Sequence, residues 1–207
     1  MKLYYSPNAC SMAIHVLLAE IGKPYEAVRV NFAESEQYQP AFVAKNPKSK
    51  VPTLERDDGS ILTELPAIAY YLAKTNPDKN LLPDGVEGEA RSLELLEYMT
   101  ATVHMRGFTR MFRPYAFAFT PADEPKVVEA GRGFVTKGFE LLAPILGEQA
   151  FLFGDNFTIA DAGLFFLEYW AAHRCNIPMP AVLNAHLARL MARPAVQKVL
   201  ADEGLTA

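Results

Sequence analysis

The sequence predicts an α+β domain with the element order βαβαββα, followed by an all-α helical bundle domain. Over residues 1–80 the hydrophobic periodicity changes roughly every dozen positions, whereas after Glu87 it remains helical. The turn-forming segment Leu82-Pro83-Asp84-Gly85 separates the two parts, and 207 residues are enough for two small domains. We therefore expect a first domain over residues 1–78, a linker over 79–86 and a helical domain over 87–207.

Two strand–helix pairs begin the chain. Lys2–Tyr5 is a short β-rich run, and Met12–Ile21 is apolar enough to form a buried helix that Gly22 closes. Apolar and polar residues alternate over residues 28–32, as in a half-buried strand, and residues 39–45 predict a short helix before a proline. This βαβα unit implies a right-handed parallel crossover.

A hairpin and a last helix complete the first domain. Val51–Glu55 and Ile61–Thr63 flank the segment Asp57-Asp58-Gly59-Ser60, whose composition favours a hairpin turn. Ala67–Lys74 then predicts the final helix, which ends before Asn76-Pro77. The complete order, βαβαββα, is a thioredoxin-like pattern.

The helical domain is predicted from apolar residues at helical spacing. They recur over residues 93–103, 127–146, 159–172 and 182–191. We interpret Pro121–Pro125 as a loop between two of these helices.

Thr158 and Asp161 predict a capping box at the start of one helix, with Asp in place of the usual Glu or Gln. We expect their role to be structural: removing such a cap typically lowers the free energy of unfolding by about 1 kcal/mol.

Composition and charge exclude several classes of function. Lys and Arg number 20 and Asp and Glu 24, a net charge of −4, and the basic residues are scattered, so we expect no nucleic-acid partner. The longest apolar stretch, near residues 162–167, is too short to span a membrane, and a proline interrupts any leader peptide. We therefore expect a cytoplasmic protein that has no membrane partner.

The spacing of Cys and His residues indicates neither a disulfide framework nor a metal site. Only Cys10 and Cys175 are present, and we expect both to be reduced. The sequence also lacks a phosphate-binding loop, a dinucleotide-binding glycine pattern and a serine-hydrolase motif. We expect no metal and no cofactor.

Cys10 is the sharpest chemical signal in the chain. It follows a strand and a turn and stands at the first residues of a helix, where free N–H groups and the helix dipole favour a thiolate. The alternative is a small buried core thiol. No second cysteine is near, so a reactive Cys10 would use an external thiol. We interpret the adjacent Ser11 as a helix cap, whose hydroxyl could also donate a hydrogen bond to the sulfur.

Three further features could bind a ligand. Val51-Pro52 marks either a sheet edge, open to a peptide-like ligand, or a cis bond. Thr63-Glu64 precedes a helix, where backbone N–H groups can hold a carboxylate while Glu64 holds an ammonium; the alternative is a charge that stabilises the helix dipole. His104 could donate a hydrogen bond into a cleft, although an isolated helical histidine is more often structural.

Cys10, Val51-Pro52, Thr63-Glu64 and the segment 157–161 together resemble the cytosolic glutathione S-transferase family over essentially the whole chain. The segment 4–11, with Asn46-Pro47-Lys48, is similar to the bacterial beta class. The resemblance implies a cytoplasmic homodimer that acts in detoxification. Such an enzyme conjugates the thiolate of its co-substrate, glutathione, to small hydrophobic electrophiles.

The resemblance also implies roles for individual residues. Val51 would pair through its backbone with the cysteinyl part of glutathione, Pro52 would be cis, and Glu64 with the Leu65 amide would hold the γ-glutamyl end. Catalysis would involve Cys10, facing the glutathione sulfur, together with Ser11 and His104. The other expected glutathione contacts are Tyr5, Lys50, Glu97 and Met105. The expected electrophile pocket consists of Phe108, Phe112, Tyr115 and Trp170, although aromatic residues at helical spacing are more often core.

Three departures from the family pattern carry consequences. Leu65 replaces a small or hydroxyl residue, which leaves the backbone amide to bind the carboxylate. Residues 33–37 lack a basic residue, so Lys50 is the candidate to replace it. The family segment T-E-L-H-K-G-F aligns with His104 from one side and with Met105 from the other. One extra residue in a helix predicts a π-bulge within residues 98–108, with His104 facing Cys10.

Two alternative functions remain open at this point. Cys10 could attack a mixed disulfide that free glutathione then resolves, as a one-thiol exchange site does. The chain could also be a non-catalytic ligand-binding protein that keeps the fold with a degraded glutathione site.

Overall fold

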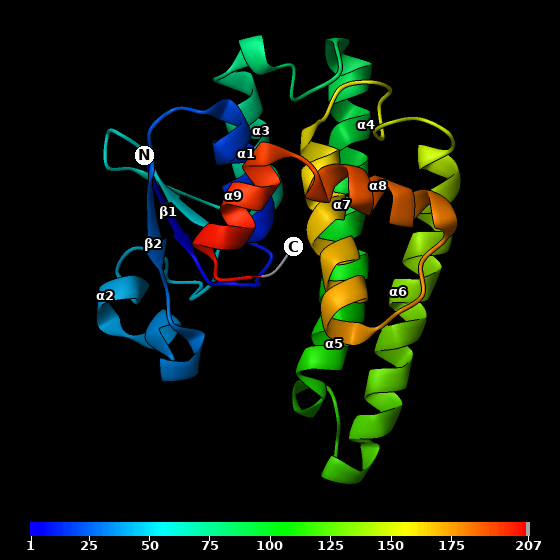
Figure 1. The fold of residues 1–207 in the computed structure, drawn as a ribbon. Coiled ribbons are helices and arrows are strands. Elements are labelled where there is room, and N and C mark those ends of the chain that lie inside the picture. Colours follow the sequence, from blue (N-terminus) through cyan, green and yellow to red (C-terminus); the bar gives the residue numbers. More distant parts are fainter. Residues whose placement is uncertain (206–207) are drawn as a thin grey trace. The chain divides into compact units, whose positions relative to one another are not determined.

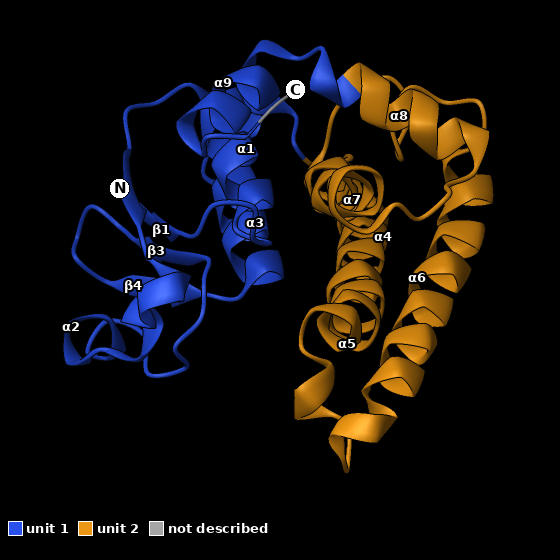
Figure 2. Ribbon diagram, turned by 60° about the horizontal axis from the view of Figure 1, so that its bottom comes forward, with its two compact units in different colours: residues 1–81, 190–207 blue, residues 82–189 orange. Residues whose placement is uncertain are grey.

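The computed structural model describes residues 1–205 and divides into two compact units, drawn in Figures 1 and 2. Unit 1 comprises residues 1–81 and the segment from Leu190 on, and unit 2 comprises residues 82–189. The expected boundary near residue 82 is present. The expected division nevertheless differs from the structure in one respect, because the segment from Leu190 on belongs with the first unit.

Unit 1 contains the predicted βαβαββα order. Its elements are β1 (Lys2–Tyr5), α1 (Met12–Ile21), β2 (Glu26–Arg29), α2 (Pro40–Val43), β3 (Thr53–Glu55), β4 (Ile61–Thr63) and α3 (Leu65–Lys74). The sheet has the strand order β2-β1-β3-β4; β1 and β2 are parallel, and the other two pairs are antiparallel. The parallel pair and the hairpin are as predicted.

The second strand is shorter than the alternation of apolar residues predicts. β2 ends at Arg29, and Phe32 begins a 3₁₀ turn instead of extending the strand. The Asn31 side chain accepts a hydrogen bond from the Ala33 N–H at 3.1 Å, and the Asn31 N–H donates to the Glu36 carboxylate at 2.6 Å. These local side-chain bonds replace the ladder bonds of a strand.

The core of unit 1 lies between the sheet and its helices. Leu3 of β1 and Leu54 of β3 face each other in the antiparallel register, and both are fully buried. α1 is buried along nearly its whole length because it contacts both α3 and the last helix of the chain. It ends at Gly22, whose φ of 75° allows its N–H to bond the Leu18 carbonyl.

That last helix, α9 (Pro194–Asp202), is absent from the sequence-based interpretation, which assigned residues 190–207 to the helical domain. In unit 1, α9 packs on α1 through an apolar face made by Val196, Val199 and Leu200 (Figure 2). Arg193 adds a two-pronged ion pair with Glu20 of α1, at 2.6 and 2.9 Å. The i, i+3, i+4 spacing of these apolar residues is a local helix signal, whereas the place of α9 in unit 1 depends on contacts with residues far away in sequence.

Unit 2 is helical, as predicted. Its helices are α4 (Gly85–Glu97), the π-helix η4 (Tyr98–Phe108), α5 (Thr109–Phe112), α6 (Glu124–Leu146), α7 (Ile159–Trp170), the π-helix η7 (Ala171–Cys175) and α8 (Ala181–Met191). The last two residues of α8 belong to unit 1. The expected loop at Pro121–Pro125 is instead a 3₁₀ turn and the beginning of α6. Thr120 and Asp123 form a capping box there, and Pro125 fits the first helical turn because that position needs no N–H donor.

Three glycines allow the helices of unit 2 to approach closely. A Cβ on Gly138 of α6 would lie 2.5 Å from a methyl group of Val103 in η4. A Cβ on Gly107 of η4 would lie 2.7 Å from Val135 of α6, and one on Gly163 of α7 would lie 2.3 Å from Leu96 of α4. Larger residues at these crossings would therefore push the helices apart.

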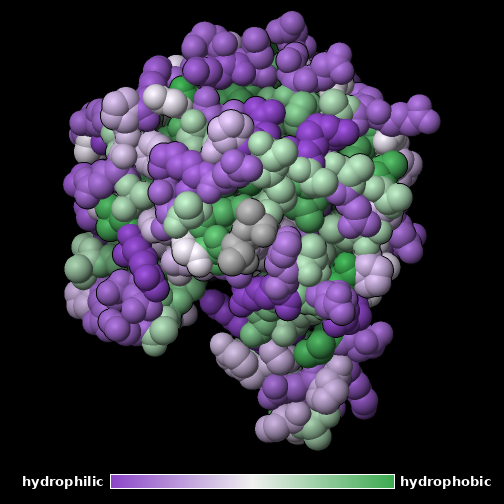
Figure 3. All heavy atoms as spheres, viewed as in Figure 1, coloured by the Kyte–Doolittle hydropathy of each residue, from purple (hydrophilic) through white to green (hydrophobic). Residues whose placement is uncertain are grey.

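The surface is of mixed polarity. On the face drawn in Figure 3, hydrophilic and hydrophobic residues are interspersed. Phe119 and Val86 are among the exposed large hydrophobic residues. Within residues 1–205, no helix combines the length and apolar character that a membrane span requires.

Candidate functional site

Cys10 lies in the turn between β1 and α1, and its sulfur is 3.5 Å from the carbonyl oxygen of Val51. Two features that are 41 residues apart in the sequence thus meet at one place. Burial raises the pKa of the Cys10 thiol to about 12, although the N–H groups of Cys10 and Ser11 and the charge of Lys50 act in the opposite direction. Burial therefore opposes the thiolate that the helix start favours, and the reactivity of Cys10 stays a prediction.

Ser11 occupies the position before the first residue of α1, but its hydroxyl does not cap the helix. The Oγ accepts from the Ser6 N–H and donates to the Ser6 carbonyl, both at 3.3 Å, and the residue is fully buried. These two hydrogen bonds close the turn that carries Cys10. The preferred interpretation of Ser11 as a cap is wrong, and its hydroxyl is engaged away from the sulfur.

The Val51-Pro52 bond is cis, as expected. It precedes β3, which pairs with both β1 and β4 from Thr53 on, so a backbone open to a peptide-like ligand can lie only before that strand, and the binding role of the Val51 backbone stays a prediction. Asn46 fixes the loop that leads to this bond. Its Nδ2 donates to the Lys50 carbonyl at 2.9 Å and to Thr53 Oγ1 at 2.8 Å, while its Oδ1 accepts from the Lys48 N–H at 3.1 Å.

Asn46 is a residue whose role the sequence analysis missed. Only 2% of it is exposed, and all three of its bonds hold backbone or side-chain groups of residues 48–53. The available signal was the Asn-Pro pair, which is typical of a turn in which an Asn side chain bonds the backbone two residues on.

Glu64 and Leu65 form the start of α3. Glu64 has a φ of 73° and a ψ of 126°, a conformation that non-glycine residues rarely adopt and that recurs at ligand sites. Its exposed carboxylate lies 2.6 Å from the Lys48 ammonium, and it makes no bond to the helix N–H groups. The Leu65 side chain is buried, which leaves its backbone as the group available to a ligand.

The charges of Lys50 and Glu64 both act on the Cys10 thiol. The charge of Lys50 lowers the pKa of the Cys10 thiol, and the charge of Glu64 raises it. Cys10, Lys50, Val51 and Glu64 therefore lie around one site in unit 1. Tyr5, five residues before Cys10, is buried, and its ring centroid lies 5.0 Å from that of His15. Its contact with glutathione stays a prediction.

The predicted π-bulge is confirmed, since residues 98–108 form a π-helix. His104 packs on Phe166 and Trp170 of α7, with ring centroids 5.5 and 5.2 Å away. His104 and Cys10 belong to different units, so the expectation that they face each other stays a prediction. The same holds for Glu97, at the end of α4, and for Met105 of η4, which are both exposed.

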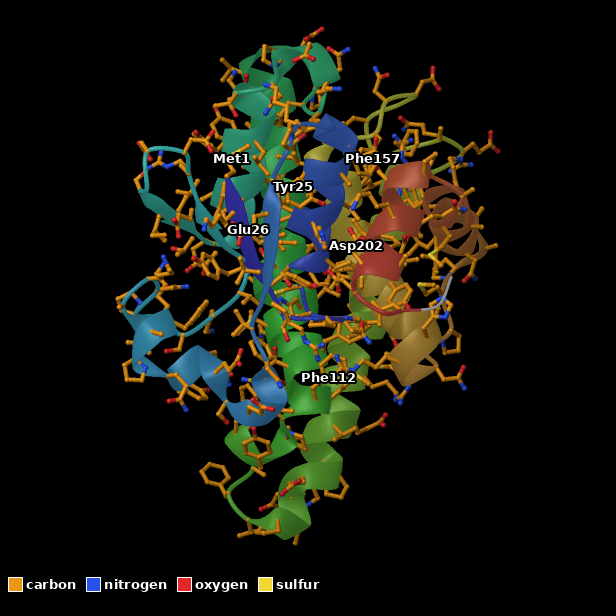
Figure 4. The ribbon with its side chains drawn as sticks, turned by 60° about the vertical axis from the view of Figure 1, so that its left-hand side comes forward. Met1, Tyr25, Glu26, Phe112, Phe157 and Asp202 are labelled. Atoms are coloured by element: carbon orange, nitrogen blue, oxygen red, sulfur yellow. The ribbon has the colours of Figure 1, made fainter. Side chains whose placement is uncertain are left out.

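Three of the four aromatic residues expected in the electrophile pocket cluster together. The ring of Trp170 lies 5.3 Å from that of Phe108 and 5.2 Å from that of Phe112. Phe108 and Trp170 are buried, as the alternative core interpretation predicts, whereas Phe112 (labelled in Figure 4) is partly exposed. The Arg174 guanidinium lies 3.8 Å from the Phe112 ring. Tyr115 is 68% exposed in a separate 3₁₀ turn.

Thr158 and Asp161 form the predicted capping box, with the Thr158 N–H and hydroxyl donating to Asp161 at 2.8 and 2.7 Å. The sequence analysis missed the buried partners of Asp161. His186 lies 3.2 Å from Asp161 and 2.9 Å from Glu168, and all three side chains are fully buried.

Burial raises the pKa of Glu168 to about 7. Burial opposes protonation of His186, but the carboxylates of Asp161 and Glu168 outweigh it and raise the pKa of His186 to about 9. All three groups lie inside unit 2, so we interpret the cluster as structural. Within the part of the chain that the structure describes, no group of three or more His, Cys, Asp or Glu residues is suited to hold a metal ion.

Comparisons with known proteins agree with this geometry. Residues 1–74 match the family model described as glutathione S-transferase, N-terminal domain. The chain is 38% identical to the glutathione S-transferase GstA of Escherichia coli O157:H7, over 99% of this chain and 100% of that protein. It is similar to the structure of a bacterial beta class glutathione S-transferase of Sphingomonas chungbukensis, with 33% identity, full coverage of both chains and a TM-score of 0.83.

A third similar protein has been solved with its ligand. It is a sphingomonad glutathione S-transferase complexed with glutathione, which shares 32% identity with this chain over the full length of both, with a TM-score of 0.83.

Proposed function

Because the chain belongs to the glutathione S-transferase family, we propose that it binds glutathione in unit 1 and conjugates the glutathione thiolate to hydrophobic electrophiles. The observation that carries this proposal is the meeting of the Cys10 thiol, the cis Val51-Pro52 bond and Glu64 around one site. A thiol, an extended backbone segment and a carboxylate match the three recognisable parts of glutathione: its sulfur, its peptide backbone and its γ-glutamyl ammonium.

Cys10 stabilises the glutathione thiolate as a hydrogen-bond donor. A free thiol has a pKa of about 8.5, so the glutathione thiol ionises well before a Cys10 thiol whose pKa is about 12. The Cys10 S–H can then turn from the Val51 carbonyl to the ligand sulfur, and the N–H groups of Cys10 and Ser11 add further donors. Donors already in place cost no reorganisation when the thiolate forms and attacks the electrophile.

The ends of glutathione have separate binding groups. The Glu64 carboxylate accepts the γ-glutamyl ammonium, and the backbone N–H at Leu65 donates to the neighbouring carboxylate at the start of α3. Lys50 is exposed and close enough to influence Cys10, so it is the candidate partner for the glycyl carboxylate. The remaining expected contacts are those of Tyr5, Glu97, His104 and Met105.

The raised pKa of the Cys10 thiol favours conjugation over the disulfide-exchange alternative. Exchange requires a thiolate as the attacking group. Burial raises the pKa of the Cys10 thiol to about 12, which disfavours its thiolate at neutral pH. Conjugation needs no ionisation of Cys10, because the nucleophile is the glutathione sulfur.

The finer parts of the proposal concern class, substrate and assembly. The Cys10 signature and one of the similar structures support a beta-class enzyme. Phe112 is the aromatic residue of the unit 2 cluster that is open to a ligand, so we place the electrophile against it, near Arg174. We also propose a cytoplasmic homodimer that acts in detoxification.

Two assays test the function. Conjugation of glutathione to a chlorodinitrobenzene should proceed with saturation in both substrates. Incubation with glutathione disulfide, followed by intact-mass measurement with and without dithiothreitol, should give little adduct on Cys10. A fast, reducible Cys10 adduct with disulfide reductase activity but no conjugation would support exchange. Absence of turnover and of glutathione binding would leave a protein that kept only the fold.

A further inference from the structure

Glu203 is a buried carboxylate that the proposed mechanism does not use. It lies just after α9, and its side chain is fully buried in unit 1. One carboxylate oxygen is 2.9 Å from Nδ1 of His15, in the middle of α1. The other accepts a hydrogen bond from the Asn8 backbone N–H, also at 2.9 Å, across 195 positions of sequence.

Asn8 belongs to the turn that places Cys10. It has a φ of 56°, in the left-handed region, and the turn is closed by a bond from the Ala9 N–H to the Ser6 carbonyl at 3.1 Å. The next bond, from the Met12 N–H to the Ala9 carbonyl at 3.0 Å, already belongs to the start of α1. Cys10 therefore stands between two points that Glu203 holds: Asn8 before it and His15 after it.

The packing of α9 does not by itself require a carboxylate at this place. Apolar residues of α9 and the Arg193–Glu20 ion pair already join α9 to α1. Burying a charged group is costly unless its oxygens are bonded, and here both oxygens are bonded to groups on either side of Cys10. What Glu203 adds to that packing is the fixed geometry of the Cys10 turn.

We propose that Glu203 is a positioning residue for the Cys10 sulfur. By holding the Asn8 N–H and the His15 ring at once, it fixes the direction in which the Cys10 thiol and the N–H groups of Cys10 and Ser11 point. The kinetic part of this inference rests on the proposed function, whereas the geometry of the thiol does not.

The surroundings of His15 define what a test must control. Nε2 of His15 lies 3.9 Å from the Asp202 carboxylate, and the ring packs against Tyr5 and Tyr25, with centroids 5.0 and 5.8 Å away. Figure 4 shows Asp202 near the end of α9 and Tyr25 just before β2. Changes at Glu203 should therefore be compared with a change that loosens α9 without touching this cluster.

Arg193 provides the matched control. Its pair with Glu20 joins the same two helices as Glu203 does, but at the far end of α1, away from the Cys10 turn. The variants Glu203→Ala, Glu203→Gln and Arg193→Leu separate the two effects. Glu203→Gln is nearly isosteric and keeps an oxygen that can accept from the Asn8 N–H, so it covers the case in which Glu203→Ala fails to fold.

The first measurement is the alkylation rate of Cys10 by iodoacetamide, resolved by peptide mass spectrometry, with Cys175 as the internal reference. Glu203→Ala should change the Cys10 rate several-fold relative to Cys175, Glu203→Gln should restore most of it, and Arg193→Leu should leave it unchanged. Unchanged Cys10 rates in both Glu203 variants, or an equal change in Arg193→Leu, would overturn the inference. This readout needs no glutathione, so it decides the inference even where conjugation is absent and the proposed function fails.

The second measurement is conjugation kinetics on the same variants. Glu203→Ala should lower kcat by about tenfold to a hundredfold, the range that small displacements of catalytic groups produce, with the KM for the electrophile unchanged. Arg193→Leu should lower the melting temperature but leave kcat as it is. A purely structural role for Glu203 predicts instead that kcat falls in both variants in proportion to the loss of stability.

Discussion

The Lys48 ammonium lies 2.6 Å from the carboxylate of Glu64 and 2.9 Å from the hydroxyl of Thr63. Lys48 is thus paired with the carboxylate that we propose binds the γ-glutamyl ammonium of glutathione. Two cations compete for one carboxylate, so Lys48 opposes binding of the ligand that Glu64 recognises.

We expect Lys48→Met to tighten glutathione binding by about twofold to threefold at low salt, the scale of a single exposed ion pair. The gain should shrink as salt rises, because exposed charges are screened. Calorimetric titration at two salt concentrations measures it. Lys45→Met is the control, since Lys45 pairs with Glu55 at 2.7 Å and its loss removes the same charge elsewhere in unit 1. Equal tightening in both variants would indicate a nonspecific charge effect.

Cys10→Ala should impair sulfur chemistry more than binding. Loss of a hydrogen bond to a charged sulfur should raise the pH at which the conjugation rate is half-maximal by about one to two units. Affinity for glutathione should change little, because its two ends are held by other residues. A pH profile and calorimetry check these expectations, and Cys175→Ala should match the wild type. Abolished binding in Cys10→Ala would contradict the assigned role.

Asn46→Ala should weaken both the fold and the site. It removes three hydrogen bonds that organise residues 48–53, although the Thr53 hydroxyl still donates to the Lys50 carbonyl. We expect a loss of about 1–3 kcal/mol in the free energy of unfolding, with weaker glutathione binding. Urea unfolding and calorimetry give the two values. Asn184→Ala, which removes an exposed bond to the Met179 carbonyl, should change neither.

His186→Gln should lower stability and remove part of its pH dependence. The raised pKa values of about 9 for His186 and about 7 for Glu168 mean that the folded state binds protons more tightly than the unfolded chain. The stabilisation from His186 is therefore complete below its unfolded pKa of about 6.5 and is lost as the pH rises through about 9.

Urea unfolding of the wild type at pH 6.5 and pH 9 should show this decline, and His186→Gln should show less of it. Breaking a buried ionic cluster should also cost about 3–5 kcal/mol at the lower pH. The exposed His173 gives the control variant His173→Gln, whose pH dependence should equal that of the wild type. An undiminished slope in His186→Gln would rule out His186 as its source, because Glu168 still titrates in this range in the variant.

Gly138→Ala should destabilise unit 2 by about 1–3 kcal/mol, because its Cβ would meet a Val103 methyl at 2.5 Å. Gly133 lies in the same helix with nothing within 4 Å of a Cβ, so Gly133→Ala should stabilise the protein by up to about 1 kcal/mol. Thermal unfolding of the two variants measures a difference of opposite sign. Equal shifts would show that helix propensity, not the helix crossing, decides the outcome.

Local patterns predicted most of the fold. The observed bounds of β1 and α1 coincide with the predicted ones, because a β-rich run and an apolar helix closed by glycine are both visible in a short window. The place of α9 in unit 1 could not be predicted, because it depends on contacts with α1, which lies more than 170 positions earlier. The π-helix was predictable only through a family pattern, since one extra residue has no meaning without a reference.

The candidate site was predictable in composition but not in its electrostatics. The cysteine, the cis proline and the acid at the helix start are all present at the expected places. The protonation state of Cys10 depends on the balance between helix N–H groups, which favour a thiolate, and burial, which opposes it. Burial is a property of the folded chain, so the sequence left a thiolate and a buried core thiol open as alternatives.

The division of unit 1 between the two ends of the chain has a consequence for its synthesis. A ribosome releases residues 82–189 before the segment that carries α9 and Glu203. Unit 2 can therefore complete its core while unit 1 still lacks a helix, and the Cys10 turn waits for a partner that is translated 195 residues after Asn8. The turn that carries Cys10 thus acquires its hydrogen bond to Glu203 only after the rest of both units has been translated.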